Sequence, residues 1–327
     1  MGSMFSAPET GGGGETEGRL RFGHSPDPDD AYMFYGFAAG GIRVELPGTP
    51  GDGTGAGRGA ARAAATAGSA AATAGSAAAT RRWRVEHVLE DIQSLNERAM
   101  RAELEITAIS AHAYPFVAEK YWVMRTGVSM GDGYGPLVVA RRPASLEDLR
   151  GATIAVPGLQ TTGILALKLF LDEFRPVLVR FDRILEAVRA GEAEAGVVIH
   201  EGQLTWQAAG VHKVADLGAL WKGETGLPLP LGLDVVRKDL GARLAAAASL
   251  ALRRSIEYAR AHHPEAMRYA LQFGRGLDSS LGDQFVGMYV NDWTLDMGDA
   301  GRRALAVLLD RAADAGLVPE VRDLKIV

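Results

Sequence analysis

The stretch GVVIHEGQLTW, Gly196 to Trp206, is the most informative segment of this chain. Its apolar run, residues 197–199, predicts a buried strand, and such strands normally end at a Gly, Asp or Asn turn. This strand is followed instead by the ionisable pair His200-Glu201. Because α/β proteins bind ligands at the carboxyl ends of their strands, the stretch predicts a binding site as well as a strand.

Strand and helix patterns alternate outward from this stretch in both directions. The strand candidates are LRFG, LEITAIS, PLVVARR, TIAVP and VLVRF, and helix patterns such as GILALKLFLDEF and DRILEAVRAGE lie between them. In EHVLEDIQSLNERAM, the apolar residues Val88, Ile92, Leu95 and Ala99 fall at helical spacing and predict a helix over the whole segment. The alternation is typical of parallel α/β layers.

A chain of 327 residues is long enough for two lobes, each with its own core. GLPLPLG is predicted to be an extended segment by which the chain crosses back from lobe two to lobe one. After it, the pattern changes to helices alone. We therefore expect lobe one to combine residues 19–141 with a helical tail over 228–327, and lobe two to span 142–227. Residues 1–18 and the low-complexity stretch 47–82, in which AAATAGS occurs twice in tandem, are predicted to be a disordered leader and a disordered insertion.

Composition excludes several classes of function. The net charge of -5 and the lack of a Lys/Arg cluster argue against nucleic acid as a partner. Without cysteine there is no disulfide, thiolate nucleophile or Cys-ligated zinc. The leader lacks the basic and apolar regions of a secretory signal, and no apolar run is long enough to span a membrane, so we expect a cytoplasmic protein. MGSMFS fits the loose myristoylation pattern at Gly2, which is often matched by chance.

Two glycine-containing motifs have a possible role in a site. GVSMG, Gly127 to Gly131, matches the serine-hydrolase elbow, but GDGYG and a strand follow Ser129 where the elbow requires a helix, which favours a simple connector. In VPGLQTTG, Gly158 permits a tight turn, and Thr161 or Thr162 can cap the helix that follows. That helix start could bind a carboxylate or phosphate, or it could be no more than a capped helix.

The histidines differ in their sequence context. His87, His112, His262 and His263 lie near predicted helix ends, where exposure is expected. His24 and His200 each follow a strand, which favours a general base or a polar ligand contact over a metal site. Glu201 is a poor partner for His200, since adjacent residues of an extended chain face opposite sides. We expect the partner to come from elsewhere in the chain.

Taken together, these motifs resemble one known family. SPDPDD, EHVLEDIQSLNERA, AISAHAY, MGDGYGPLVVAR, VPGLQTT and VVIHEGQLT are similar to segments of the 1,4-dihydroxy-6-naphthoate synthases of the futalosine route to menaquinone. The resemblance runs from Arg19 to the C-terminus except for the insertion. It implies an α/β, two-lobed type II periplasmic-binding-protein-like fold with the active site in the interlobe cleft.

The resemblance also implies a reaction and a set of site residues. The reaction is carbon–carbon cleavage of cyclic dehypoxanthinylfutalosinate to 1,4-dihydroxy-6-naphthoate and dihydroxyacetone, with His200 as the proton acceptor. It implies no metal and no cofactor, a small molecule as the substrate, and no membrane or obligate protein partner. The substrate-binding positions it implies are Asn96, Ala108, Ile109, Ser110, Thr161, Thr162 and Gly163. A solute-binding protein of the same fold and the related chorismate dehydratase are the alternatives, and the VVIHEGQLT run argues against the dehydratase.

Overall fold

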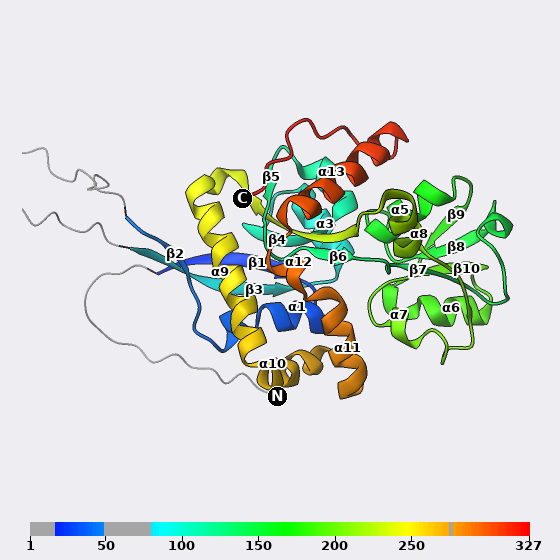
Figure 1. Ribbon diagram of the computed structural model, residues 1–327, viewed down its shortest axis with the longest axis horizontal. Helices are drawn as coiled ribbons and strands as arrows, with labels where there is room; N and C mark the ends of the chain where they lie inside the picture. The colour runs from blue at the N-terminus through cyan, green and yellow to red at the C-terminus, as the bar shows by residue number, and fades with distance from the viewer. Residues whose placement is uncertain (1–16, 49–79, 275–276) are drawn as a thin grey trace, which may run out of the picture.

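The computed structural model describes residues 17–48, 80–274 and 277–327, and within them the chain forms two α/β lobes, each with its own sheet (Figure 1). The fold class predicted from the sequence is confirmed. Most of the predicted leader and insertion, together with Gly2, lie outside the described residues. Among the described residues, no helix is both long and apolar enough to cross a membrane.

The larger lobe is built on a seven-stranded sheet. Its strand order is β2-β3-β1-β4-β12-β5, with β6 paired to β12 beside β5. Strand β1 runs parallel to both β3 and β4, and β12 is antiparallel to β4. The strands are β1 (Gly18–His24), β2 (Val44–Leu46), β3 (Arg81–Leu89), β4 (Ile106–Ser110), β5 (Tyr121–Val123), β6 (Ser129–Gly131) and β12 (Leu229–Arg237).

The helix predicted over residues 86–100 is wrong in its first part, because residues 86–89 belong to strand β3. The helix α3 begins only at Ile92, where the Asp91 side chain accepts hydrogen bonds from the first backbone N–H groups. Before Asp91 the chain is extended, and Trp83 and Val85 are buried at the two-residue spacing of a strand. Val88 falls by coincidence at the helical spacing of Ile92 and Leu95, and that made the prediction wrong. Strand β3 also takes in two arginines, residues 81–82, that were assigned to the insertion.

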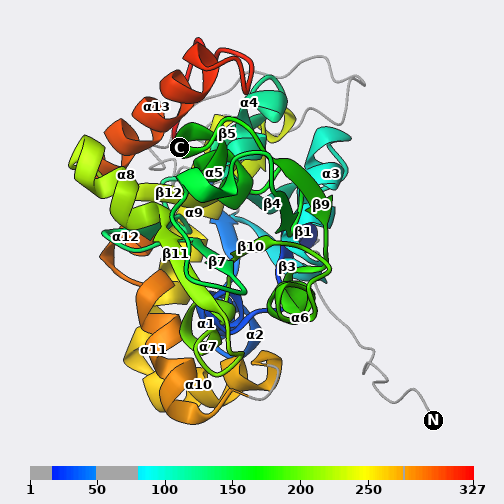
Figure 2. The same ribbon diagram turned by 90° about the vertical axis from the view of Figure 1, so that its right-hand side faces the viewer.

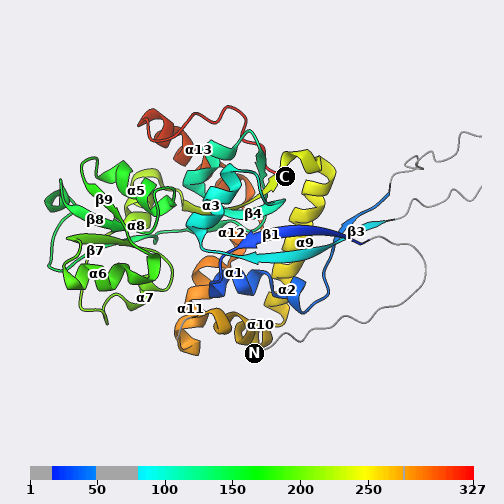
Figure 3. The ribbon, with the colours of Figure 1, turned by 180° about the vertical axis from the view of Figure 1, so that it is seen from behind.

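Helices cover both faces of this sheet (Figures 1 and 3). Helices α1, α2, α9 and α10 share an apolar core with β1 and β3, while α3 and α13 pack on the opposite side against β4 and β12. The C-terminal helices thus return to the lobe in which the chain began. The helices of this lobe are α1 (Pro28–Met33), α2 (Tyr35–Ala38), α3 (Ile92–Met100), α4 (Tyr114–Val117), α9 (Ala242–Ala261), α10 (His263–Ala270), α11 (Ser279–Tyr289), α12 (Asp292–Leu295) and α13 (Gly298–Asp314).

The smaller lobe is a five-stranded sheet in the order β11-β7-β10-β8-β9. Figure 2 views this lobe from its outer side, with its helices on both faces of the sheet. Strand β7 belongs to this sheet, so the crossing between the lobes falls before Leu137, earlier than the boundary expected at 141. Its elements are β7 (Leu137–Ala140), β8 (Thr153–Val156), α5 (Thr162–Phe170), β9 (Arg175–Leu178), α6 (Ile184–Ala190), β10 (Ala195–Val198), α7 (Gly202–Thr205), β11 (His212–Asp216) and α8 (Leu217–Thr225).

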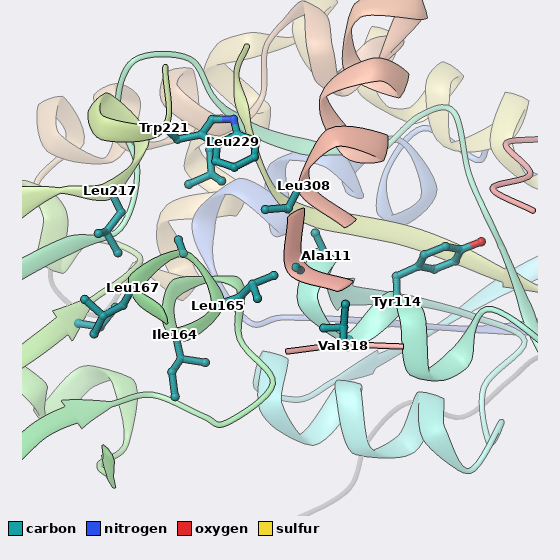
Figure 4. Packing of buried hydrophobic residues seen from close by; sticks show 14 of the residues in the cluster. Ala111, Tyr114, Ile164, Leu165, Leu167, Leu217, Trp221, Leu229, Leu308 and Val318 are labelled. Carbon is teal, nitrogen blue, oxygen red and sulfur yellow. The ribbon is translucent and has the colours of Figure 1, made fainter. Parts of the chain in front are cut away.

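One apolar cluster runs across the junction of the lobes. Leu165 on α5 and Trp221 on α8 belong to the same buried cluster as Leu308 on α13 and Tyr114 on α4 (Figure 4). All four are fully buried or nearly so. This packing fixes α5 beside the larger lobe, and it thereby places the first turn of α5 at the junction.

Candidate active site

A pocket lies between the lobes and draws its walls from both. Its volume is about 790 Å³, counting the part open to solvent. The larger lobe contributes helix α1 and the residue after β1, the end of β4, the middle of β12 and part of α11. The smaller lobe contributes the start of α5 and the segment after β10. Most of the wall is apolar, with polar groups at a few points.

The predicted site residues converge on this pocket. Those that line it are Ala108, Ile109, Ser110, Thr161, Thr162, Gly163 and His200. Asn96 is fully buried behind the wall. Its side-chain oxygen accepts a hydrogen bond from the Ser110 backbone N–H at 2.8 Å, and its amide nitrogen donates to the Ser110 hydroxyl at 3.2 Å. Asn96 therefore positions Ser110, and it does not line the pocket.

The start of helix α5 has no side-chain cap. The Thr161 hydroxyl donates to the Gly158 carbonyl, and the Thr162 hydroxyl donates to the Leu231 carbonyl at 2.6 Å. The expectation that one of these threonines caps the helix was wrong, because both hydroxyls bond to carbonyl groups outside α5. Since residues 161–163 line the pocket, uncapped N–H groups and the positive end of the helix dipole lie at its wall, where they favour an anionic ligand group.

His200 lies just beyond the end of β10 in a left-handed backbone conformation, with φ of 58°. Histidine is one of the few residues other than glycine that adopts this region with any frequency. The Nδ1 atom of His200 is 3.2 Å from Oδ2 of Asp27, and the ring packs edge-on against Phe181. Asp27 is 2% exposed and lies between β1 and α1 in the other lobe. The partner of His200 does come from elsewhere in the chain, as expected.

Three carboxyl groups in the pocket wall were missed by the sequence reasoning: Asp29, Asp30 and Asp234. Burial raises the pKa of Asp234 and of Asp29 well above the usual range, and it raises the pKa of Asp30 to about 6 despite two hydrogen bonds from Ser25. One oxygen of Asp29 and one of Asp234 are buried and have no hydrogen-bond partner in the part of the chain that the structure describes. The SPDPDD motif held a signal for the first two, whereas nothing near Asp234 marks it.

The raised pKa values of Asp29 and Asp234 favour the neutral form of these carboxyls over the carboxylate. A neutral carboxylic acid donates a hydrogen bond through its O–H group, which suits the carbonyl and hydroxyl oxygens of a polyoxygenated ligand. No group of three or more His, Asp or Glu side chains among the described residues could hold a metal ion. The pocket therefore combines acids that can donate protons, one imidazole that can accept one, and a helix terminus suited to an anion.

The remaining sequence motifs have structural roles. Ser129 opens the short strand β6 and lines the pocket, but no helix follows it, so the hydrolase elbow is absent. His24 is buried at the end of β1, where its Nε2 atom is 2.9 Å from Nδ1 of His87 and burial lowers its pKa to about 3. His112 and His87 were expected to be exposed. His112 is instead buried, and His87 is half-buried on β3.

Two α/β lobes around a ligand pocket define the class of periplasmic-binding-protein-like folds. A ligand-binding component of an import system from Staphylococcus aureus shares the fold, with a TM-score of 0.61 at 9% identity over 95% of this chain and 97% of that one. A crystal structure from Archaeoglobus fulgidus is much more similar. It has a TM-score of 0.76 at 40% identity, and the match covers 92% of this chain and 98% of the other.

Comparison of sequences defines the family. The family model described as menaquinone biosynthesis matches residues 20–314. The chain is 39% identical to a 1,4-dihydroxy-6-naphthoate synthase of Thermus thermophilus, over 93% of this chain and 98% of that one. It is 34% identical to the protein of that name from Streptomyces coelicolor, over 92% and 95% of the two chains. The chain belongs to this family of menaquinone-biosynthesis enzymes, which confirms the resemblance predicted from its sequence.

Proposed function

We propose that this chain is a carbon–carbon lyase that converts cyclic dehypoxanthinylfutalosinate to 1,4-dihydroxy-6-naphthoate and dihydroxyacetone. The observation that carries the proposal is the convergence, in one interlobe pocket of a member of the menaquinone family, of His200, Ser110 and the uncapped start of α5. The chain would act in the cytoplasm on a small molecule, with no nucleic acid, membrane or obligate protein partner.

The aromatic carboxylate of the substrate is assigned to the start of α5. Its negative charge is stabilised by the N–H groups at Thr162 and Gly163 and by the helix dipole. Ser110, held by Asn96, offers a hydroxyl from the larger lobe to the same pocket. Contacts from both lobes therefore hold the substrate with its reacting carbons near His200.

His200 acts as the general base. With Nδ1 directed at Asp27, Nε2 is the ring nitrogen that accepts a proton from the substrate. Loss of that proton starts ring opening, and cleavage of one carbon–carbon bond then releases the three-carbon fragment. Formation of an aromatic naphthoate supplies the driving force, so the proposed reaction requires no oxidant and no cofactor. The neutral acids of the wall are suited to donate hydrogen bonds to the oxygens that gain charge.

The direct test is to incubate the purified protein with the cyclic substrate and to follow the naphthoate chromophore, while dihydroxyacetone is quantified separately. We expect the two products in equal amounts. Chorismate serves as the control substrate, because the related dehydratase would consume it. Turnover of chorismate alone, or tight binding of the cyclic compound without turnover, would contradict the proposal in favour of the dehydratase or of a solute-binding protein.

A further inference from the structure

The contact between His200 and Asp27 joins the two lobes. His200 follows β10 of the smaller lobe, whereas Asp27 precedes α1 of the larger one. The side chain of Asp27 makes no capping bond to α1, although Asp at this position commonly accepts from the helix N–H groups. It lies instead with Oδ2 at 3.2 Å from Nδ1 of His200, which belongs to the smaller lobe.

A second contact between the lobes holds the same short segment. The hydroxyl of Tyr289, on α11 of the larger lobe, donates a hydrogen bond at 2.8 Å to the side chain of Gln203. The backbone N–H of Gln203 in turn donates to the His200 carbonyl at 3.1 Å. The segment that carries the base is therefore contacted by two side chains of the opposite lobe: Asp27 lies at the imidazole, and Tyr289 bonds to Gln203 on α7.

We propose that Asp27 is a positioning residue, which orients the His200 imidazole across the cleft and fixes its proton on Nδ1. The inference rests on the proposed role of His200 as base. A carboxylate that accepts from Nδ1–H stabilises the tautomer in which Nε2 has a free lone pair, and it also stabilises the imidazolium that forms when Nε2 takes up a proton. Because Asp27 belongs to the other lobe, the base is complete only when the two lobes are together.

The first test is kinetic. Asp27→Asn keeps the shape of the side chain and removes its charge, so kcat should fall by roughly 10- to 10⁴-fold with little change in KM, as when an amide replaces the carboxylate that orients a catalytic histidine. Asp27→Glu, which keeps the carboxylate, should retain more activity than the Asn variant. In a His200→Asn background, Asp27→Asn should cause no further loss, since the two residues act as a unit.

The second test needs no substrate. Nitrogen NMR of histidine-labelled protein distinguishes the two neutral tautomers, and the His200 signal is assigned by its loss in His200→Asn. We expect the Nδ1–H tautomer to dominate in the wild type, free or with 1,4-dihydroxy-6-naphthoate bound, and the other tautomer to gain population in Asp27→Asn. Asp283→Asn is the matched control: Asp283 lies 2.9 Å from His263 on the surface, so its removal should alter only the His263 signal and leave turnover unchanged.

The two tests separate this inference from the proposed function. A wild-type protein that does not produce the naphthoate would overturn the function, while the NMR comparison would still decide whether Asp27 sets the tautomer. If the wild type is active but Asp27→Asn keeps both its kcat and its His200 tautomer, Asp27 is not a positioning residue. An equal loss of kcat in the His200→Asn background would also overturn the inference, because Asp27 would then act independently of the imidazole.

Discussion

Asn96 bonds to Ser110 through both atoms of its side-chain amide, one to the backbone and one to the hydroxyl. Asn96 is fully buried on α3, and Ser110 is the last residue of β4. The amide thus satisfies a buried N–H group at the end of a strand and at the same time directs the hydroxyl of a pocket residue. One side chain outside the pocket determines the geometry of one of its walls.

Replacing Asn96 should therefore affect both stability and binding. Asn96→Ala leaves the buried Ser110 N–H without a partner, which should lower the free energy of unfolding by about 1–3 kcal/mol. KM should rise more than kcat falls, because the Ser110 hydroxyl loses its orientation. Urea unfolding and steady-state kinetics measure the two effects. Ser110→Ala, which keeps the N–H bond to Asn96, should cost less stability; equal losses in the two variants would refute this account of Asn96.

Gly163 tests the assignment of the substrate carboxylate to the start of α5. A methyl group at this position would lie 3.0 Å from Val197 and 3.3 Å from Ile199, both in the segment that leads to His200. The first turn of α5 would have to move, so the affinity for 1,4-dihydroxy-6-naphthoate should fall by about tenfold, or about 1.4 kcal/mol. Calorimetric titration measures the affinity.

Gly223→Ala on α8 is the control for that variant, because its added methyl group would meet nothing within 4 Å. The control should bind the naphthoate as the wild type does. Wild-type affinity in Gly163→Ala would show that the carboxylate binds elsewhere in the pocket.

Asp234 should make stability depend on pH. Burial raises its pKa in the folded protein well above the unfolded value of about 3.9, and repulsion from Asp30 adds to the rise. The folded state therefore binds the proton more tightly, so this stability is fully present below the unfolded pKa and is lost as pH rises through the folded pKa. Asp234→Asn does not titrate and should be the more stable protein at pH 8, by about 1–3 kcal/mol, the cost of leaving a buried polar group unpaired.

Urea unfolding at pH 5 and at pH 8 tests this dependence. The advantage of Asp234→Asn over the wild type should grow with pH. Asp172→Asn alters an exposed ion pair with Arg150 and should change stability by less than about 1 kcal/mol at either pH. An advantage that is constant or shrinks as pH rises would mean that Asp234 is already ionised in the folded protein.

The sequence predicted those parts of the structure that depend on local pattern. The strand before His200 and the helix after the Gly158 turn have clear apolar patterns. The residues at the end of that strand and at the start of that helix meet in the pocket because they lie at the same edge of the smaller lobe's sheet. The helix predicted before Asp91 was wrong for a local reason: Val88 falls at the helical spacing of Ile92 and Leu95, and only the pairing of β3 with β1 shows that Val88 lies on a strand.

The parts of the site that were not predicted from the sequence depend mainly on contacts between distant segments. Asp27 contacts His200 only because the fold brings together two distant segments, one from each lobe. No local sequence pattern carries that information. Asp234 is buried in the middle of β12, where a single Asp in an extended segment gives no sign that it faces a pocket. The left-handed conformation of His200 likewise has no sequence marker, because it is glycine, and not histidine, that usually signals such a turn.

The central claim is that His200 removes a proton from the substrate, and the turnover of His200→Asn tests it most directly. Asparagine tolerates the left-handed backbone at this position and keeps a polar side chain, but it cannot serve as a base. We predict that kcat for conversion of the cyclic substrate falls by about 10² to 10⁴, with binding of the naphthoate retained. Near-normal turnover in His200→Asn would contradict the account and place the base on another residue.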